Sequence, residues 1–108
     1  MIDAVFYKDA TDKYIGFSVS GHAGYAKRGQ DIVCSAISAL TINTVNSIEK
    51  FTDNTYKLET GASGKIKFKF TSDSDEKGQL LLNALVLGIT EIYKEYDGKY
   101  LQVYFKEV

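Results

Sequence analysis

The stretch IDAVFYKDATDKYIGFSVS, residues 2–20, contains two runs in which apolar side chains alternate with other types. Such alternation is typical of a strand with one buried face. The apolar residues of one face are Ile2, Ala4 and Phe6 in the first run and Ile15, Phe17 and Val19 in the second. The segment KDATDK between the runs is polar and reads as a turn. The stretch therefore predicts a β-hairpin at the start of the chain.

Beyond the hairpin the period of the pattern changes from two to about 3.6. Ile37, Leu40, Thr44 and Ile48 recur at three- and four-residue steps, which predicts an amphipathic helix from about residue 32 to 51. Asp31 is placed to be its N-cap. Further along, the patterns predict strands near 56–59 and 65–70, joined across TGASG, then a helix over about 75–96 and a final strand from about 100.

The predicted order is β-β-α-β-β-α-β in a single domain that spans residues 1–108. An α+β two-layer domain fits this order best, with a mostly antiparallel sheet of about five strands and two helices on one face. The apolar arc of the second helix is wider than one sheet face needs. We therefore expect this helix to contact the first helix and, in addition, to offer a homodimer interface.

Composition limits the partners and the cellular location. Thirteen basic and fourteen acidic residues nearly cancel, so no overall positive field predicts nucleic-acid binding. The lysines of KIKFKF, residues 65–70, could meet an acidic partner or RNA, but solvation of the sheet is the favoured interpretation. No signal peptide is visible at the N-terminus, and the most apolar stretch, 80–89, is about half of a bilayer span. A cytoplasmic protein that is not membrane-bound is expected.

The only histidine and the only cysteine, His22 and Cys34, flank a glycine-rich loop that leads into the first predicted helix. A cysteine in the first turn of a helix is stabilised as a thiolate by the unpaired amides and the helix dipole. His22 could act as its proton acceptor, and first-turn amides could bind the oxyanion of an attacked carbonyl. One continuous segment would then supply a site for acyl transfer. With one residue of each type, a tetrahedral zinc site is not expected, nor is any cofactor.

Simpler interpretations of the same residues stay open at this point. Lone cysteines are often small buried hydrophobes, and a loop histidine is usually a surface residue. Asp31 is either only a helix cap or also orients His22, and Ser38, one turn after Cys34, either hydrogen-bonds near the thiol or merely packs. The chain could also be a binding module without chemistry, or a protein of thiol exchange, although a single cysteine argues against a dithiol cycle.

The stretch GHAGYAKRGQDIVCSAISAL, residues 21–40, closely resembles the signature of the ribosomal-processing cysteine protease family Prp. That signature combines Gly-His-Ala, a variable loop that contains a glycine, and Asp-Ile/Val-Val-Cys followed by small residues and a serine. The matching positions here are Gly21, His22, Ala23, Gly29, Asp31, Ile32, Val33, Cys34 and Ser38. The length of the chain and its order of elements also match.

The resemblance implies a cytosolic, homodimeric endopeptidase. Members of this family remove an N-terminal extension from large-subunit ribosomal protein twenty-seven. By analogy Cys34 is the nucleophile and His22 the general base, while Gly21, Asp31 and Ser38 are supporting site residues. The loop over residues 23–30 is implied to close over the peptide, and we expect it to become ordered only when substrate binds.

Overall fold

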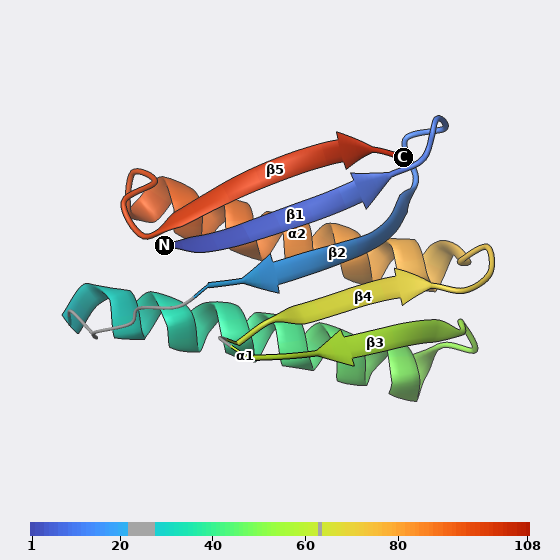
Figure 1. Cartoon of the computed structure of the whole chain (residues 1–108). Helices are drawn as coiled ribbons and strands as arrows, with labels where there is room; N and C mark the ends of the chain where they lie inside the picture. Colours follow the sequence, from blue (N-terminus) through green and yellow to red (C-terminus); the bar gives the residue numbers. More distant parts are fainter. Residues whose placement is uncertain (22–27, 63) are drawn as a thin grey trace.

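The computed structural model describes residues 1–21, 28–62 and 64–108, except for the side chains of residues 28–31. The elements follow the predicted order β-β-α-β-β-α-β (Figure 1). They are β1 (Ile2–Lys8), β2 (Tyr14–Ser20), α1 (Arg28–Phe51), β3 (Tyr56–Thr60), β4 (Ile66–Phe70), α2 (Glu76–Glu95) and β5 (Leu101–Glu107).

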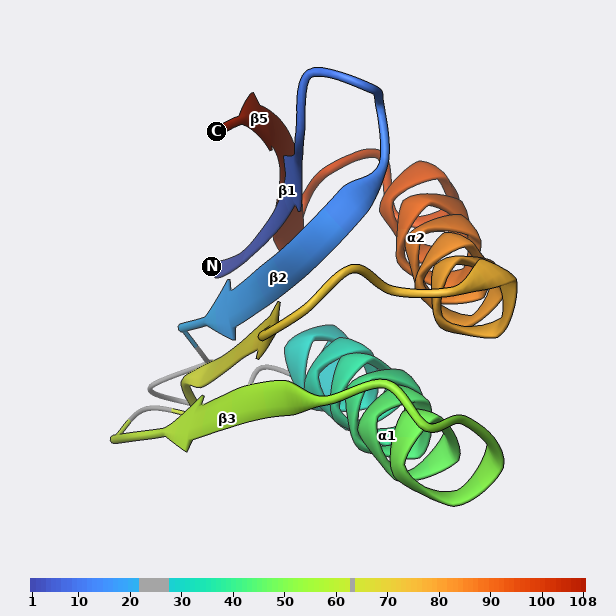
Figure 2. The same cartoon turned by 90° about the vertical axis from the view of Figure 1, so that its right-hand side faces the viewer.

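The five strands form one mixed sheet in the order β3-β4-β2-β1-β5. Three neighbouring pairs are antiparallel, including the predicted β1–β2 hairpin, and only β1 and β5 are parallel. Both helices pack on the same side of the sheet, and the opposite side carries no helix (Figure 2). The predicted two-layer α+β fold is confirmed.

The core lies between the sheet and the helices. Alternation places Ile2, Ala4 and Phe6 of β1 in it, each at most 2% exposed. Phe17 of β2 stacks on Phe68 of β4 with ring centroids 5.2 Å apart, which ties the hairpin to the neighbouring strand. The predicted inward face of the strand pattern is therefore confirmed for most positions.

Ile15 is an exception, because the structure places it on the open side of the sheet. The β1–β2 register pairs Tyr7 with Gly16 but Lys8 with Tyr14, which leaves Ile15 without a direct partner. Such a β-bulge inserts one extra residue and reverses the facing of the residues before it. Tyr14 consequently points into the core, where it is 7% exposed.

α1 starts earlier than the sequence predicts. Its first residue is Arg28, so Asp31 lies inside the helix and is not its N-cap. Cys34 accordingly lies in the second turn and not in the first. The periodic apolar pattern begins only near residue 32. Residues 28–31 contain no apolar side chain, so the pattern does not indicate that the helix includes them.

The wide apolar arc of α2 is used in part against α1, as predicted. Leu82, Leu85 and Ile89 are buried. A Cβ placed on Gly88 would lie 3.0 Å from a methyl carbon of Leu40 in α1, so the two helices approach closely there. Leu80 remains exposed on the outer side of α2, and the homodimer interface predicted for this helix stays a prediction.

Within the described residues, Ile32–Phe51 of α1 is long and apolar enough to cross a membrane by length and composition. The sequence had suggested no stretch of that length. The core helix of a soluble protein meets the same test, however, and Val33, Ile37 and Ile48 of this helix are packed into the core. The apolar character of α1 is thus explained by its contact with the sheet.

α2 is capped at its N-terminus by Asp75. The Asp75 carboxylate accepts hydrogen bonds from the Gly78 backbone amide at 3.0 Å and from the Asn54 side-chain amide at 2.7 Å. The Asn54 side-chain oxygen in turn accepts from the Asp75 amide at 2.9 Å. The Asn54 bond, followed by the Gly78 bond, holds the pKa of Asp75 below its usual value.

We expect Asp75→Ala to lower the Tm by a few degrees at pH 7, because the α2 cap and the link to Asn54 are lost. A carboxylate whose folded pKa is depressed stabilises the fold above its unfolded pKa of about 3.9. This contribution is lost as the pH falls through the lower folded value. The difference in Tm from wild type, measured by circular dichroism, should therefore shrink below pH 4. Asp73→Ala, which removes an exposed carboxylate nearby, should show no such pH-dependent difference.

Candidate active site

A small pocket of about 60 Å³ lies where the C-terminal end of β2 meets α1. Its wall is formed by four parts of the chain, namely β1, the end of β2, α1 and the turn between β3 and β4. The described lining residues are Ile2, Val19, Gly21, Cys34, Ile37, Ser38 and Gly64. The pocket therefore brings together three of the residues that the sequence singled out, namely Gly21, Cys34 and Ser38.

Cys34 contributes a free, partly exposed thiol to this pocket. Its neighbour Val33 and the next inward residue, Ile37, are buried, so the helix is anchored on both sides of the thiol. The alternative that Cys34 is a fully buried core residue is wrong. A thiol that lines a pocket is accessible to a reacting group, which is the first requirement of a nucleophile.

The position of Cys34 changes the expected electrostatics. The dipole effect of a helix falls off within its first turn, and the unpaired amides belong to the first four residues. Because α1 begins at Arg28, those amides precede Cys34. The prediction that the thiol itself sits in the first turn, with adjacent first-turn amides for the oxyanion, is wrong for this reason.

Gly21 ends β2 at the pocket in a conformation that only glycine adopts easily. Its φ is +84°, and a Cβ at this position would lie 2.3 Å from the carbonyl oxygen of Met1. Any side chain here would push the start of β1 away from the end of β2. The motif glycine thus has a physical role, since it lets the chain leave β2 directly beside the thiol.

Ser38 lies one helical turn after Cys34, is exposed, and lines the same pocket. Asp31 lies in α1 one turn before Cys34, but its side chain is outside the described part of the structure. His22 and the loop residues up to 27 also lie outside it, so the expected closure of this loop is not tested. Residues 28–30 of that predicted loop belong to α1.

Gly64 is a pocket residue that sequence reasoning missed. Its φ is +67°, and a Cβ there would be 3.9 Å from the Gly21 carbonyl oxygen. β4 pairs with β2, with Val19 opposite Ile66, and this pairing carries the β3–β4 turn to the thiol. The sequence shows the TGASG turn but gives no signal that its strand lies next to β2.

Comparison with known proteins identifies a family for this chain. A family model described as cysteine protease Prp matches residues 1–102. The chain belongs to the cysteine protease Prp family. A Bacillus subtilis relative named ribosomal processing cysteine protease Prp is 28% identical over 101 residues, which cover 89% of this chain and 90% of the relative. A Staphylococcus aureus relative of the same name is 26% identical over 80 residues, or 73% and 76% of the two chains.

Solved structures share the fold over the whole chain. The crystal structure of SMU.848 from Streptococcus mutans has a TM-score of 0.89 and 32% identity, with 100% of this chain and 96% of that chain covered. The Prp protease of S. aureus in complex with a substrate peptide has a TM-score of 0.90 at 22% identity, with 98% and 100% covered. At that identity the second likeness shows the fold alone. As a member of the Prp family, the protein is a cysteine protease.

Within residues 1–21, 28–62 and 64–108, no group of three or more His, Cys, Asp or Glu side chains is arranged to hold a metal ion.

Ser38→Leu is expected to slow alkylation of Cys34 by iodoacetamide several-fold, because a larger side chain would cover the mouth of the small pocket. Cys34 is the only cysteine, so intact-mass spectrometry over time measures its labelling without ambiguity. Ser35→Leu is the matched control, since Ser35 is exposed on α1 and is not among the described lining residues. Equal rates for the two variants would mean that the thiol is reached by another route.

Proposed function

We propose that the protein is an endopeptidase that removes the N-terminal extension of large-subunit ribosomal protein twenty-seven, with Cys34 as nucleophile and His22 as general base. The observation that carries the proposal is the place of Cys34. The only cysteine of a cysteine protease family member lies in a pocket, partly exposed, beside Gly21 and Ser38.

In the proposed reaction His22 accepts the proton of the Cys34 thiol, and the sulfur attacks the carbonyl carbon of the scissile peptide bond. The C–N bond then breaks, His22 returns the proton to the leaving amine, and the acyl group stays on sulfur as a thioester. A water molecule, deprotonated by His22, hydrolyses the thioester. The products are a new N-terminus on the ribosomal protein and a free carboxylate on the removed peptide.

The supporting residues have separate roles in this proposal. Gly21 lets the chain turn next to Cys34, and His22 follows Gly21 directly in the sequence. Asp31, one turn before Cys34, orients the His22 imidazole, as the third member of a triad does. Ser38 presents a hydroxyl at the pocket wall, where it can hydrogen-bond to the substrate.

The substrate assignment is supported by the names of the relatives, which are ribosomal processing proteases. A related S. aureus enzyme has been crystallised with a substrate peptide. We extend this to a cytoplasmic enzyme that acts without metal or cofactor and works as a homodimer. The exposed Leu80 and Leu87 on the outer side of α2 are the surface that we assign to the dimer.

The proposal is tested by incubating the protein with the ribosomal protein of the same organism that carries the N-terminal extension. The masses of the products are then measured by mass spectrometry. We expect a single cut within the N-terminal extension by wild type and none by Cys34→Ala. Intact substrate in both samples would contradict the substrate assignment. An active Cys34→Ala variant would contradict the mechanism.

A further inference from the structure

One side of the sheet carries no helix (Figure 2). The strand registers align one row of side chains across it: Lys57 of β3, Lys69 of β4, Gly16 of β2, Tyr7 of β1 and Lys106 of β5. The next row is Glu59, Lys67, Ser18, Val5 and Tyr104. We call the exposed side chains of these two rows, together with Ile15 and Val108 beside them, the open-face site.

The lysines of the open-face site outnumber its one acid, Glu59, which lies directly opposite Lys67 on the neighbouring strand. Lys57 and Lys69 lie directly opposite each other on neighbouring strands, and like charges in such pairs destabilise a sheet. Glu59 lies 3.5 Å from Lys57. Among the described residues, Lys67 and Lys69 have no carboxylate within salt-bridge distance. A bound anion would relieve the repulsion that remains.

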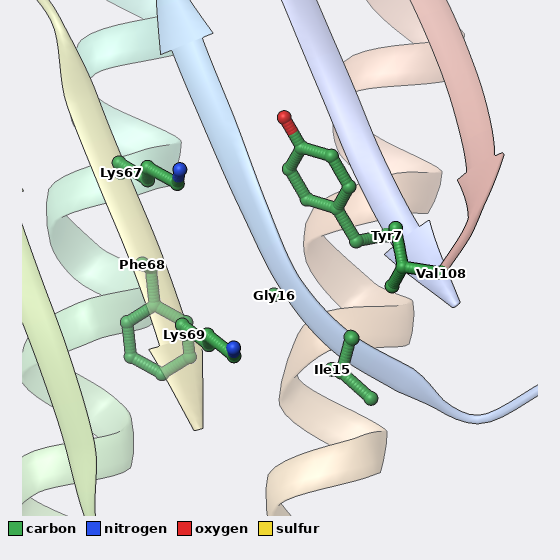
Figure 3. A pocket seen from close by; sticks show the side chains of 7 residues that line it. All are labelled: Tyr7, Ile15, Gly16, Lys67, Phe68, Lys69 and Val108. Atoms are coloured by element: carbon green, nitrogen blue, oxygen red, sulfur yellow. The ribbon is translucent and has the colours of Figure 1, made fainter. Parts of the chain in front are cut away.

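A cavity of about 200 Å³ occupies the centre of the open-face site (Figure 3). Gly16 has no side chain, so the floor of this cavity is bare backbone. A Cβ at this position would lie 2.4 Å from the Phe68 carbonyl oxygen, which explains why a glycine stands here. Lys67 and Lys69 line one side, and Tyr7 lines the other. A second hollow of about 220 Å³ lies toward β3 and is lined by Lys57, Lys67, Lys69 and the carboxylate-bearing Glu59. Anionic groups can therefore enter between two ammonium groups and a phenol.

Aromatic and hydroxyl groups accompany these charges. The Tyr104 side chain is 46% exposed, and the Tyr7 hydroxyl lies 3.3 Å from the Ser18 hydroxyl. Lysines that contact phosphates, with exposed rings on which bases stack, are how sheet surfaces bind single-stranded nucleic acid. The exposed Tyr104 ring, on which a base can stack, favours nucleic acid over an acidic peptide. The hydroxyl pair can in addition hydrogen-bond a ribose 2′-hydroxyl, which favours RNA over DNA.

We propose that the open-face site binds single-stranded RNA. From the sequence alone the β4 lysines are expected only to solvate the sheet, and the net charge of −1 gives no overall attraction. The site is a local feature, separate from the proteolytic one. The Cys34 thiol belongs to α1, on the helix-covered side of the sheet, whereas the open-face site lies on the opposite side.

The test uses fluorescence anisotropy with a labelled ten-nucleotide oligouridylate and the full chain. At low ionic strength we expect saturable binding that weakens as salt rises. Lys67→Glu/Lys69→Glu should lower the affinity at least tenfold. The slope of log K against log salt should also decrease by about 0.7 per lost phosphate contact. Tyr104→Ala should lower the affinity at least about fivefold, because one base loses its stacking partner.

Lys50→Glu/Lys77→Glu is the charge-matched control. Both residues are exposed and belong to the helices, on the other side of the sheet. We expect this variant to bind RNA nearly as well as wild type. Equal losses in the two double variants would mean that affinity follows net charge, and the proposal would be wrong.

Two further outcomes would overturn the proposal. One is the absence of binding to wild type at low salt. The other is displacement of the oligouridylate by poly-glutamate at the same charge concentration, which would assign the surface to acidic polypeptides. Circular dichroism and peptide cleavage should be unchanged in Lys67→Glu/Lys69→Glu, so loss of RNA binding is separable from loss of fold or of proteolysis.

Discussion

Replacing His22 by alanine is expected to lower kcat/KM for peptide cleavage at least about 100-fold, the usual contribution of a positioned general base. The thiol would still be present, but nothing would take its proton or return it to the leaving amine. Cleavage of a fluorogenic peptide that spans the processing site measures this effect. The Tm of the same variant, measured in parallel, separates a loss of catalysis from a loss of fold.

The two proposed catalytic residues should act as a unit. Cys34→Ala is expected to lower kcat/KM by about 1000-fold or more, and His22→Ala/Cys34→Ala should be no slower than Cys34→Ala alone. Lys27→Ala, in the same segment of sequence as His22, is the control and should retain activity. Independent, multiplicative losses in the double variant, or full activity of His22→Ala, would contradict the proposed dyad.

The elements of the fold could be predicted from the period of the apolar pattern, and the failures have local causes. β1 and β4 alternate cleanly, and their inward residues are buried as expected apart from Ile66, which is partly buried. Ile15 was assigned to the wrong face because a β-bulge shifts the register by one residue, and nothing in the apolar pattern marks that position. The start of α1 was missed because residues 28–31 are polar and add no apolar periodicity.

The site could be predicted only in part, because motif positions are local but the pocket is not. Gly21, Cys34 and Ser38 were singled out by the motif, and the fold brings them together. Ile2 and Gly64 join them only through strand pairing, which no short stretch of sequence specifies. The proposed nucleophile can thus be predicted from the motif. The residues that line the pocket around it depend on how the strands of the sheet pair.

Gly21→Ala is expected to lower both stability and activity. A residue with a side chain is strained at a φ of +84°, at a cost of about 1–3 kcal/mol. The added Cβ would also meet the Met1 carbonyl oxygen at 2.3 Å, so the ends of β1 and β2 must separate. The Tm should fall by about 10 °C or more. Because Gly21 lines the pocket, kcat/KM should fall as well at temperatures where the variant is still folded.

Gly61→Ala separates strain at one position from a general effect of adding a methyl group. Among the residues that the structure describes, a Cβ on Gly61 would meet only the Lys65 side chain, at 3.8 Å, which is ordinary van der Waals contact. This variant should match wild type in thermal denaturation and in peptide cleavage. If Gly21→Ala also kept its Tm, the start of β1 would have to move away from the added Cβ at no cost in stability. If it lost stability but kept full kcat/KM, the geometry at Gly21 would matter to the fold and not to the thiol beside it.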